Sequence, residues 1–210
     1  MGRRHAAFFL ALAEEADPEL REGVRQWAWL ERLEAEHDNL RAALSWSLND
    51  KPEQALRLAV ALARFWVIRA YFSEGSGWLE AGLRRSGRAD AALRARASTE
   101  AGTFAWCQSD YDRAIAFHRE ALTLYRGLGD ERGVAFALIF WACQELEKGD
   151  REGAERAAPH LEEALALGRK LGDELISAYA LHNLGGVAQV QATTSAVSLT
   201  VRKPSPFTGR

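Results

Sequence analysis

Apolar residues recur at helical spacing along most of the chain, and one stretch of this pattern is repeated. EALTLYRGLGDE at 120–131 and EALALGRKLGDE at 163–174 agree at nine of twelve positions and lie 43 residues apart. In the first copy the apolar residues Leu122, Leu124, Tyr125 and Leu128 fall on one face of a helix. The repeated pattern therefore predicts amphipathic α-helices that recur along the chain.

Each copy also marks the end of one helix and the start of the next. Gly129 can adopt the left-handed conformation that ends a helix, and Asp130 can cap the helix that follows. Glu131 places negative charge in the first turn of that helix. Residues 171–174 repeat the arrangement. Two further turns lie 40 residues apart and have Asp in second place: Ser109-Asp110 and Gly149-Asp150.

Each unit is thus a helix, a short turn, a second helix and a short turn. We therefore expect an all-α protein, an α-solenoid in which antiparallel helix pairs stack side by side. The expected organisation is N-terminal helices over 1–50, helical repeats over 51–191 and an irregular tail over 192–210. The expected repeat units lie near 54–90, 91–130 and 131–173, with a partial unit at 174–191.

Small residues at the turns and helix crossings resemble the tetratricopeptide repeat (TPR). The TPR pattern has a small residue in helix A, a Gly-Asp-Tyr type of turn, and small residues seven apart in helix B. The matching residues are Gly102, Asp110-Tyr111, Ala114 and Ala121, then Ala142, Gly149-Asp150, Ala157 and Ala164, and finally Leu184-Gly185. The resemblance implies a right-handed superhelix in which the A helices line a concave groove, and small residues let the paired helices cross closely.

The first fifty residues predict an amphipathic helix that ends near Asp17-Pro18, then a longer helical stretch, QWAWLERLEAEHDNLRAALSWSL. Its segment LEAEHDNLRAAL at 33–44, followed by helical pairs that end in Leu-Gly-Asp, resembles the helical arm of certain bacterial regulators. These are the STAND or NB-ARC type ATPases of the AfsR-like and LuxR-type multidomain transcriptional regulators. The resemblance covers roughly residues 3–191 and implies an arm that senses an inducer or partner and controls the ATPase switch.

Composition and motifs narrow the function. The 210 residues have a net charge of −2 and no apolar run of membrane-spanning length, so we expect a cytoplasmic protein without a direct nucleic-acid or membrane partner. Cys107 and Cys143 are expected to be buried reduced thiols. GLGDERGV at 127–134 lacks the Lys of a phosphate-binding loop, and no nucleophile or metal-ligand motif is present. We expect no enzyme, no cofactor and no metal.

Aromatic residues are expected to serve packing. Seven tryptophans are spread over nearly every predicted helix, which favours burial between helices over a stacking platform for bases or sugars. His118 stands where the repeat usually has an aromatic residue, so we expect it to pack in the core.

Binding is the remaining chemistry. The geometry implied by the TPR resemblance places these residues on the groove: Thr99, Thr103, Trp106 and Cys107; Phe136, Ile139, Cys143 and Leu146; Tyr179, His182 and Gln189. The middle group is apolar, and we expect it to receive a protein or peptide partner or another domain of the regulator, such as its ATPase or DNA-binding module. The alternative is that this group is buried within the chain.

The sequence also allows other functions. A freestanding TPR adaptor and a receptor for a small molecule or peptide would use the same groove. An open repeat array also tends to associate with itself. Residues 192–210 contain prolines, β-branched residues and three basic residues without an acid, which favours an irregular tail that packs on nothing. Contact of this basic tail with nucleic acid is the alternative.

Overall fold

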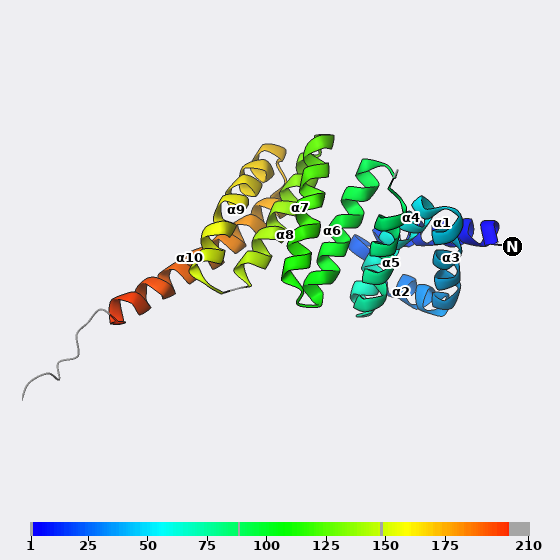
Figure 1. Cartoon of the computed structure of the whole chain (residues 1–210), viewed down its shortest axis with the longest axis horizontal. Coiled ribbons are helices and arrows are strands. Elements are labelled where there is room, and N and C mark those ends of the chain that lie inside the picture. Colours follow the sequence, from blue (N-terminus) through cyan, green and yellow to red (C-terminus); the bar gives the residue numbers. More distant parts are fainter. Residues whose placement is uncertain (1, 88, 148, 202–210) are drawn as a thin grey trace, which may run out of the picture. The chain divides into compact units, whose positions relative to one another are not determined.

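The computed structural model describes residues 2–87, 89–147 and 149–201, and these residues are helical almost throughout (Figure 1). No strand occurs in this part of the chain, so the prediction of an all-α helical-repeat fold is confirmed. In order, the helices are α1 (Gly2–Glu22), α2 (Gln26–Ala35), α3 (His37–Asp50), α4 (Pro52–Ile68), α5 (Phe72–Arg85), α6 (Ala91–Cys107), α7 (Tyr111–Leu128), α8 (Glu131–Leu146), α9 (Arg151–Leu171) and α10 (Glu174–Val201). They form two compact units, residues 1–129 and 130–210.

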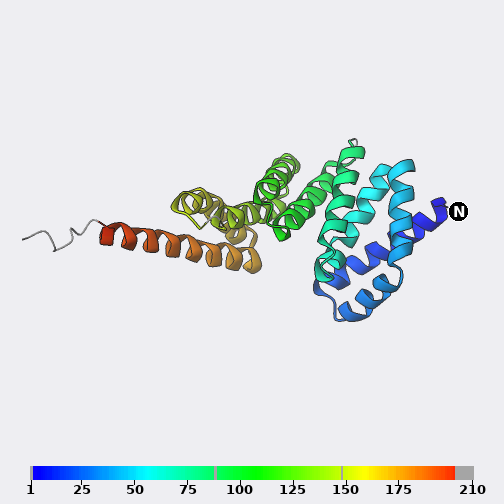
Figure 2. The same ribbon diagram turned by 60° about the horizontal axis from the view of Figure 1, so that its bottom comes forward.

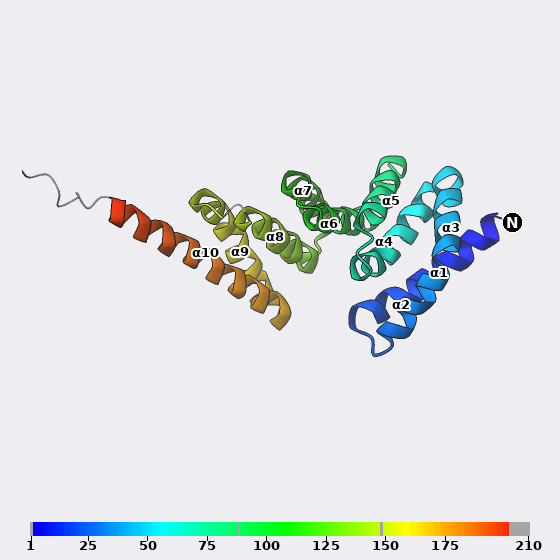
Figure 3. The ribbon, with the colours of Figure 1, turned by 90° about the horizontal axis from the view of Figure 1, so that it is seen from below.

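The first unit has one apolar core that runs from α1 to α6. α1 and α3 pack on α4, α4 packs on α5, and α6 packs on α5 and α7 (Figure 3). Trp66 and Phe104 meet edge to face in this core, and Leu20 of α1 and Leu33 of α2 belong to the same cluster. The expected division near residue 50 is therefore not a division in packing, because the N-terminal helices bury their apolar faces against the first repeat.

The second unit consists of α8, α9 and α10. α9 packs on both α8 and α10, and α8 also touches α10 (Figure 2). Leu138, Leu161 and Ile176, one from each helix, are fully buried. At one end of the unit Arg132 Nε donates to Asp173 Oδ2 over 2.9 Å. These contacts pack α10 against the pair that α8 and α9 form.

The duplicated turns have the predicted geometry. Gly129 (φ 70°) ends α7 and Gly172 (φ 65°) ends α9, both in the left-handed conformation. The carboxylate of Asp130 then accepts a hydrogen bond from Gly133 N at 2.9 Å and caps α8. Ser109 (φ 60°) has the same left-handed backbone between α6 and α7, although it is not a glycine. The predicted helix ends and starts are confirmed because each depends on residues within one turn of the chain.

The close crossing within a helix pair is also seen. A Cβ added to Gly102 of α6 would lie 2.5 Å from Cε1 of His118 on α7, and His118 is fully buried. The prediction that His118 packs in the core is confirmed. Only a residue without a side chain lets the imidazole ring approach the α6 backbone this closely.

The prediction that the first helix ends near Asp17-Pro18 is wrong, because α1 continues through Pro18 to Glu22. Proline inside a helix removes one hydrogen bond and crowds the preceding turn, which costs roughly 3 kcal/mol. Tertiary contacts offset this penalty. Leu20 is fully buried, and Arg21 donates to Asp17 at 2.7 Å and to Glu100 of α6 at 2.8 Å.

Two further segments differ from expectation. The long helical stretch after α1 is two helices, because the backbone leaves helical geometry at Glu36 (φ −98°, ψ 8°). α10 continues through 192–201, where the sequence predicted an irregular segment. β-Branched residues lower helix propensity only slightly, and the Thr193 hydroxyl donates to the Gln189 carbonyl at 2.9 Å. The rest of the predicted tail, 202–210, lies outside the described residues.

The tryptophans divide between core and surface. Trp29 and Trp66 are buried, as expected, but Trp27 is 70% exposed. The guanidinium of Arg69 lies 5.7 Å from the Trp27 ring centroid, a cation–π contact that an exposed ring can make. Packing between helices is therefore the wrong explanation for Trp27.

Candidate functional site

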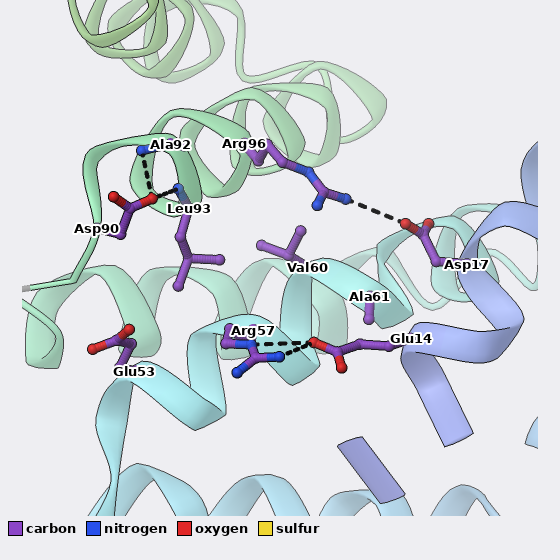
Figure 4. A pocket seen from close by; sticks show the side chains of 10 residues that line it. All are labelled: Glu14, Asp17, Glu53, Arg57, Val60, Ala61, Asp90, Ala92, Leu93 and Arg96. Atoms are coloured by element: carbon purple, nitrogen blue, oxygen red, sulfur yellow. Dashed lines mark hydrogen bonds and ion pairs between the residues drawn. The ribbon is translucent and has the colours of Figure 1, made fainter. Parts of the chain in front are cut away.

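A cleft of about 500 Å³ opens in the first unit between α1, α4 and α6 (Figure 4). Its apolar side chains are Val60 and Ala61 from α4 and Ala92 and Leu93 from α6. Among the described residues that line it, four are acidic and two are arginines. The cleft is therefore a partly apolar hollow with a charged rim, a combination that binds ligands with both apolar and polar groups.

Ion pairs connect the walls of the cleft. Arg57 of α4 donates through Nη2 and Nε to Glu14 of α1, at 2.6 and 3.1 Å, and Arg96 of α6 lies 3.2 Å from Asp17 of α1 (Figure 4). Exposed pairs of this kind contribute roughly 0–1 kcal/mol each, so their main effect is to orient the rim. Glu53 makes no ion pair with another described residue.

The start of α6 is fixed at the edge of the same cleft. Asp90 precedes α6, and its carboxylate accepts hydrogen bonds from Ala92 N at 3.0 Å and Leu93 N at 3.3 Å. An aspartate cap of this kind satisfies backbone donors that the helix leaves unpaired. The Asp90 carboxylate is thus engaged with the backbone, and Glu53 is the acidic group of the rim best placed to receive a cation from a ligand.

The groove residues predicted on α6 lie outside this cleft. Thr99 and Thr103 are half-buried, and their hydroxyls donate to the carbonyls of Ala95 and Thr99, at 3.0 and 3.1 Å, within the helix. Thr99 Oγ1 is also 3.3 Å from Tyr125 Oη of α7. These hydroxyls are therefore occupied by contacts inside the first unit.

Trp106 and Cys107 are exposed at the C-terminal end of α6, whereas the cleft takes its α6 residues from the N-terminal half. The expectation that Cys107 is a buried thiol is wrong. Cys107 is the last residue of α6, and its side chain is exposed.

In the second unit, Arg132, Phe136 and Phe140 follow one another at intervals of four on α8, and we call them the aromatic strip. The two phenylalanine rings stack with centroids 6.4 Å apart and planes 27° from parallel. The Arg132 guanidinium lies 5.3 Å from the Phe136 centroid. Its hydrogen bond to Asp173 lowers the pKa of that carboxyl below its usual value. The strip thus has aromatic faces and a cation held in place.

Three of the groove residues predicted on α8 are buried or half-buried, and two of them contact α10. Ile139 is 3% exposed, so the expectation that it lines an open groove is wrong. Cys143 is half-buried and its thiol donates to Asn183 Oδ1 of α10 at 3.3 Å. Burial, and then the nearby charge of Glu147, raise the pKa of Cys143 to about 11. Leu146 lies beside α10, with Cδ1 3.8 Å from the position of a Cβ added to Gly186.

The groove residues predicted on α10 are exposed. Tyr179, His182 and Gln189 all face solvent, and the Tyr179 carbonyl accepts a hydrogen bond from Asn183 Nδ2 at 2.9 Å. Leu175 is also exposed. With the 43-residue offset of the repeat, Leu175 and Tyr179 on α10 take the places that Arg132 and Phe136 have on α8.

No helix among the described residues is both long and apolar enough to cross a membrane. In residues 2–87, 89–147 and 149–201, no three His, Cys, Asp or Glu side chains gather as metal ligands.

Comparison with known proteins finds relatives among transcriptional regulators. No family model matches the chain. Over 171 residues, 77% of this chain, it is 34% identical to proteins of Mycobacterium bovis and of two strains of Mycobacterium tuberculosis, each named "Putative HTH-type transcriptional regulator". The chain spans 18% of the length of these curated relatives. The crystal structure of BtubC (BKLC) from P. vanneervenii covers 99% of this chain and 95% of its own, with 16% identity and a TM-score of 0.49. The chain is therefore similar in sequence to a segment of HTH-type transcriptional regulators.

Proposed function

We propose that this chain is the TPR-type helical arm of a bacterial transcriptional regulator of the STAND ATPase kind, and that it works in the cytoplasm as a binding module and not as an enzyme. Its partner would be a protein or peptide segment, including another module of the same regulator. The similarity to transcriptional regulators over 171 residues supports the regulatory role. The stacked helix pairs with glycine turns support a binding role, since such arrays present extended surfaces.

The aromatic strip is the observation that carries the proposal. Aromatic rings and arginine are the side chains most enriched where protein interfaces gain their binding energy. Phe136 and Phe140 are half-buried, so their rings are already ordered and lose little freedom when a partner covers them. Leu175 and Tyr179 extend the strip on α10 with exposed apolar surface. An extended or helical segment with apolar side chains fits this surface.

The test uses a library of displayed 12-residue peptides selected on the whole chain, with affinities measured by fluorescence anisotropy. Phe136→Asp should weaken the selected peptides about tenfold or more, because a charge replaces an anchoring ring. The melting temperature should stay unchanged. Phe8→Asp is the matched control, since Phe8 is 59% exposed on α1 in the other unit and should not affect binding.

Two results would contradict the proposal. Peptides that bind Phe136→Asp as tightly as the original chain would show that the strip is not the binding surface. Unfolding of Phe136→Asp, with Phe8→Asp intact, would assign the ring to the core, which is the alternative already weighed for the apolar residues of α8.

The cleft between α1, α4 and α6 favours a second candidate function, that of a small-molecule receptor. Its volume of about 500 Å³ lies within the usual range of ligand pockets. The apolar floor and Glu53 fit a ligand with an apolar body and a cationic group. A library of such amines should raise the melting temperature of the chain, and Glu53→Gln should remove the effect. If no amine shifts the melting temperature, the receptor function is excluded.

A further inference from the structure

α10 has a solvent-facing apolar surface that no described residue covers. Its centre is a row spaced three, four, three and four residues apart, which we call the α10 face: Ala178, Leu181, Gly185, Ala188 and Ala192. Leu181 is 53% exposed, and a Cβ added to Gly185 would have nothing within 4 Å. The exposed side chains of Leu175 and Tyr179 lie next to it. Large apolar side chains exposed together mark an interaction site.

In the two preceding repeats, the row of residues equivalent to the α10 face is buried by the next helix. The equivalent rows are Ala95, Ser98, Gly102 and Ala105 on α6, and Ala135, Leu138, Ala142 and Glu145 on α8. Every one of these eight residues is buried. Gly102 lies against His118 of α7, and Glu145 accepts a hydrogen bond from Arg156 of α9 at 2.8 Å. The second helix of each pair covers the row of the first helix, whereas the row on α10 is open.

Within α10 the chain does not turn at the position that corresponds to the turn after α8. Gly149 has φ 67° and reverses the chain between α8 and α9. The corresponding position, 43 residues later, is Ala192, and there α10 continues as a helix. A helix that covers the α10 face therefore does not begin at the position where α9 begins in the preceding repeat.

We propose that a second copy of this chain covers the α10 face, with the two α10 helices packed antiparallel about a twofold axis. The side chains needed for the covering helix are known from α9, whose buried row is Ala154, Ala157, Leu161 and Ala164. α10 likewise offers three small residues and one leucine at the same spacing, with Gly185 in place of one alanine. α10 therefore has the side chains that a helix covering the α10 face would need, so the α10 helices of two copies can cover each other.

The absence of charged side chains on most of α10 favours a second copy of the chain over a partner that is recognised by its charge. From 175 to 193 there is no Asp, Glu, Lys or Arg. Ala188 stands where α8 has Glu145, so a covering helix needs no counterpart of Arg156. Two such helices approach each other without like-charge repulsion and without burying an unpaired ion. Over these 19 residues the helices run side by side for roughly 28 Å.

The first experiment measures the mass of the whole chain by sedimentation equilibrium. The 23.3 kDa chain should form a dimer. Leu181→Glu should raise the dimer dissociation constant about tenfold or more, because it would bury a carboxylate in an apolar contact. Leu128→Glu is the control, since Leu128 is 44% exposed at the end of α7 in the other unit and should leave the constant unchanged. A monomer at all concentrations up to about 0.1 mM, or equal constants for both variants, overturns the proposal.

The second experiment tests the symmetry and needs no disruptive change. Gly185 is the middle of the α10 face, so about a twofold axis it lies opposite its own counterpart. In a Cys107→Ser, Cys143→Ser background, Gly185→Cys should form an intermolecular disulfide under mild oxidation, since space around Gly185 is open. Ala166→Cys, exposed on α9, is the matched control. Crosslinking of Gly185→Cys no faster than that of the control overturns the antiparallel pairing.

Phe136→Asp should leave dimerisation unchanged, which separates this inference from the proposed function.

Discussion

Gly102 offers the sharpest test of how the helix pairs are packed. In Gly102→Ala the added Cβ would lie 2.5 Å from Cε1, 2.6 Å from Nε2 and 2.8 Å from Nδ1 of His118. Non-bonded carbon atoms rest roughly 3.5–4.0 Å apart, so the imidazole ring would have to move by about 1 Å. His118 is fully buried, and its surroundings give the ring no free space.

Two opposing contributions set the magnitude. An extra methyl in a well-packed core costs roughly 1–3 kcal/mol, and the upper part of that range applies because a rigid ring is displaced. Alanine is the better helix former by about 1 kcal/mol. Gly102→Ala should therefore lower the free energy of unfolding by about 2 kcal/mol. Gly127→Ala is the matched control in α7, because a Cβ there meets nothing within 4 Å. It should raise the free energy by up to about 1 kcal/mol.

The next repeat, 131–173, also supplies the compensating change. Ala142 and Leu161 occupy the places of Gly102 and His118, and both are fully buried. The double variant Gly102→Ala, His118→Leu should recover most of the loss, which urea unfolding followed by circular dichroism measures as a coupling energy. Hydrogen exchange of the α6 amides assigns the effect to the first unit. The reasoning is refuted if Gly102→Ala stabilises the protein as Gly127→Ala does.

Three further outcomes are expected. Ser109→Gly should raise the free energy of unfolding by about 0.5–1 kcal/mol in urea titrations, since φ is 60° there, and a loss of stability would contradict this. With Cys107→Ser, the remaining Cys143 should react with a disulfide reagent negligibly at pH 8 and faster only as pH approaches its pKa of about 11; rapid reaction at pH 8 would refute its burial. The carboxyl of Asp173 has a lowered pKa because of its Arg132 hydrogen bond, so the pair stabilises the fold above the ordinary carboxyl pKa and the effect disappears as pH falls through the folded value. Arg132→Gln should reduce this acid dependence, measured by thermal unfolding between about pH 2 and 5, and an unchanged profile would count against the pair.

The helix ends could be predicted from the sequence because their causes are local. Gly129 and Gly172 have the backbone conformation expected of them, and the aspartate after each accepts a hydrogen bond from the first turn of the next helix. A turn needs only a few adjacent residues with the right conformational freedom and hydrogen-bonding groups. The burial of His118 could also be predicted, because the repeat usually has a packed aromatic residue at that position.

The candidate sites were harder to predict because they depend on contacts between distant segments. The cleft combines Glu14 and Asp17 with residues of α4 and α6, and no spacing in the sequence indicates that α1 forms one wall. One feature of the sequence could have indicated the cleft. Arg57 and Arg96 occupy similar positions in the first helices of two successive helix pairs. Ile139 was assigned to an open groove because the sequence does not show which apolar residues of α8 the neighbouring helices bury.

By itself, the sequence determined the helical repeat, its turns and the small residues at the helix crossings, since these follow from backbone conformation and side-chain size within about one turn. Only the tertiary structure decided which apolar residues meet a neighbour and which meet solvent. Leu138 and Leu181 occupy equivalent positions in equivalent helices, yet the first is buried and the second exposed. The difference is the covering helix, which is present over α8 and absent over α10 among the described residues. Burial is a property of what packs against a residue, and the residue's own sequence neighbourhood does not contain that information.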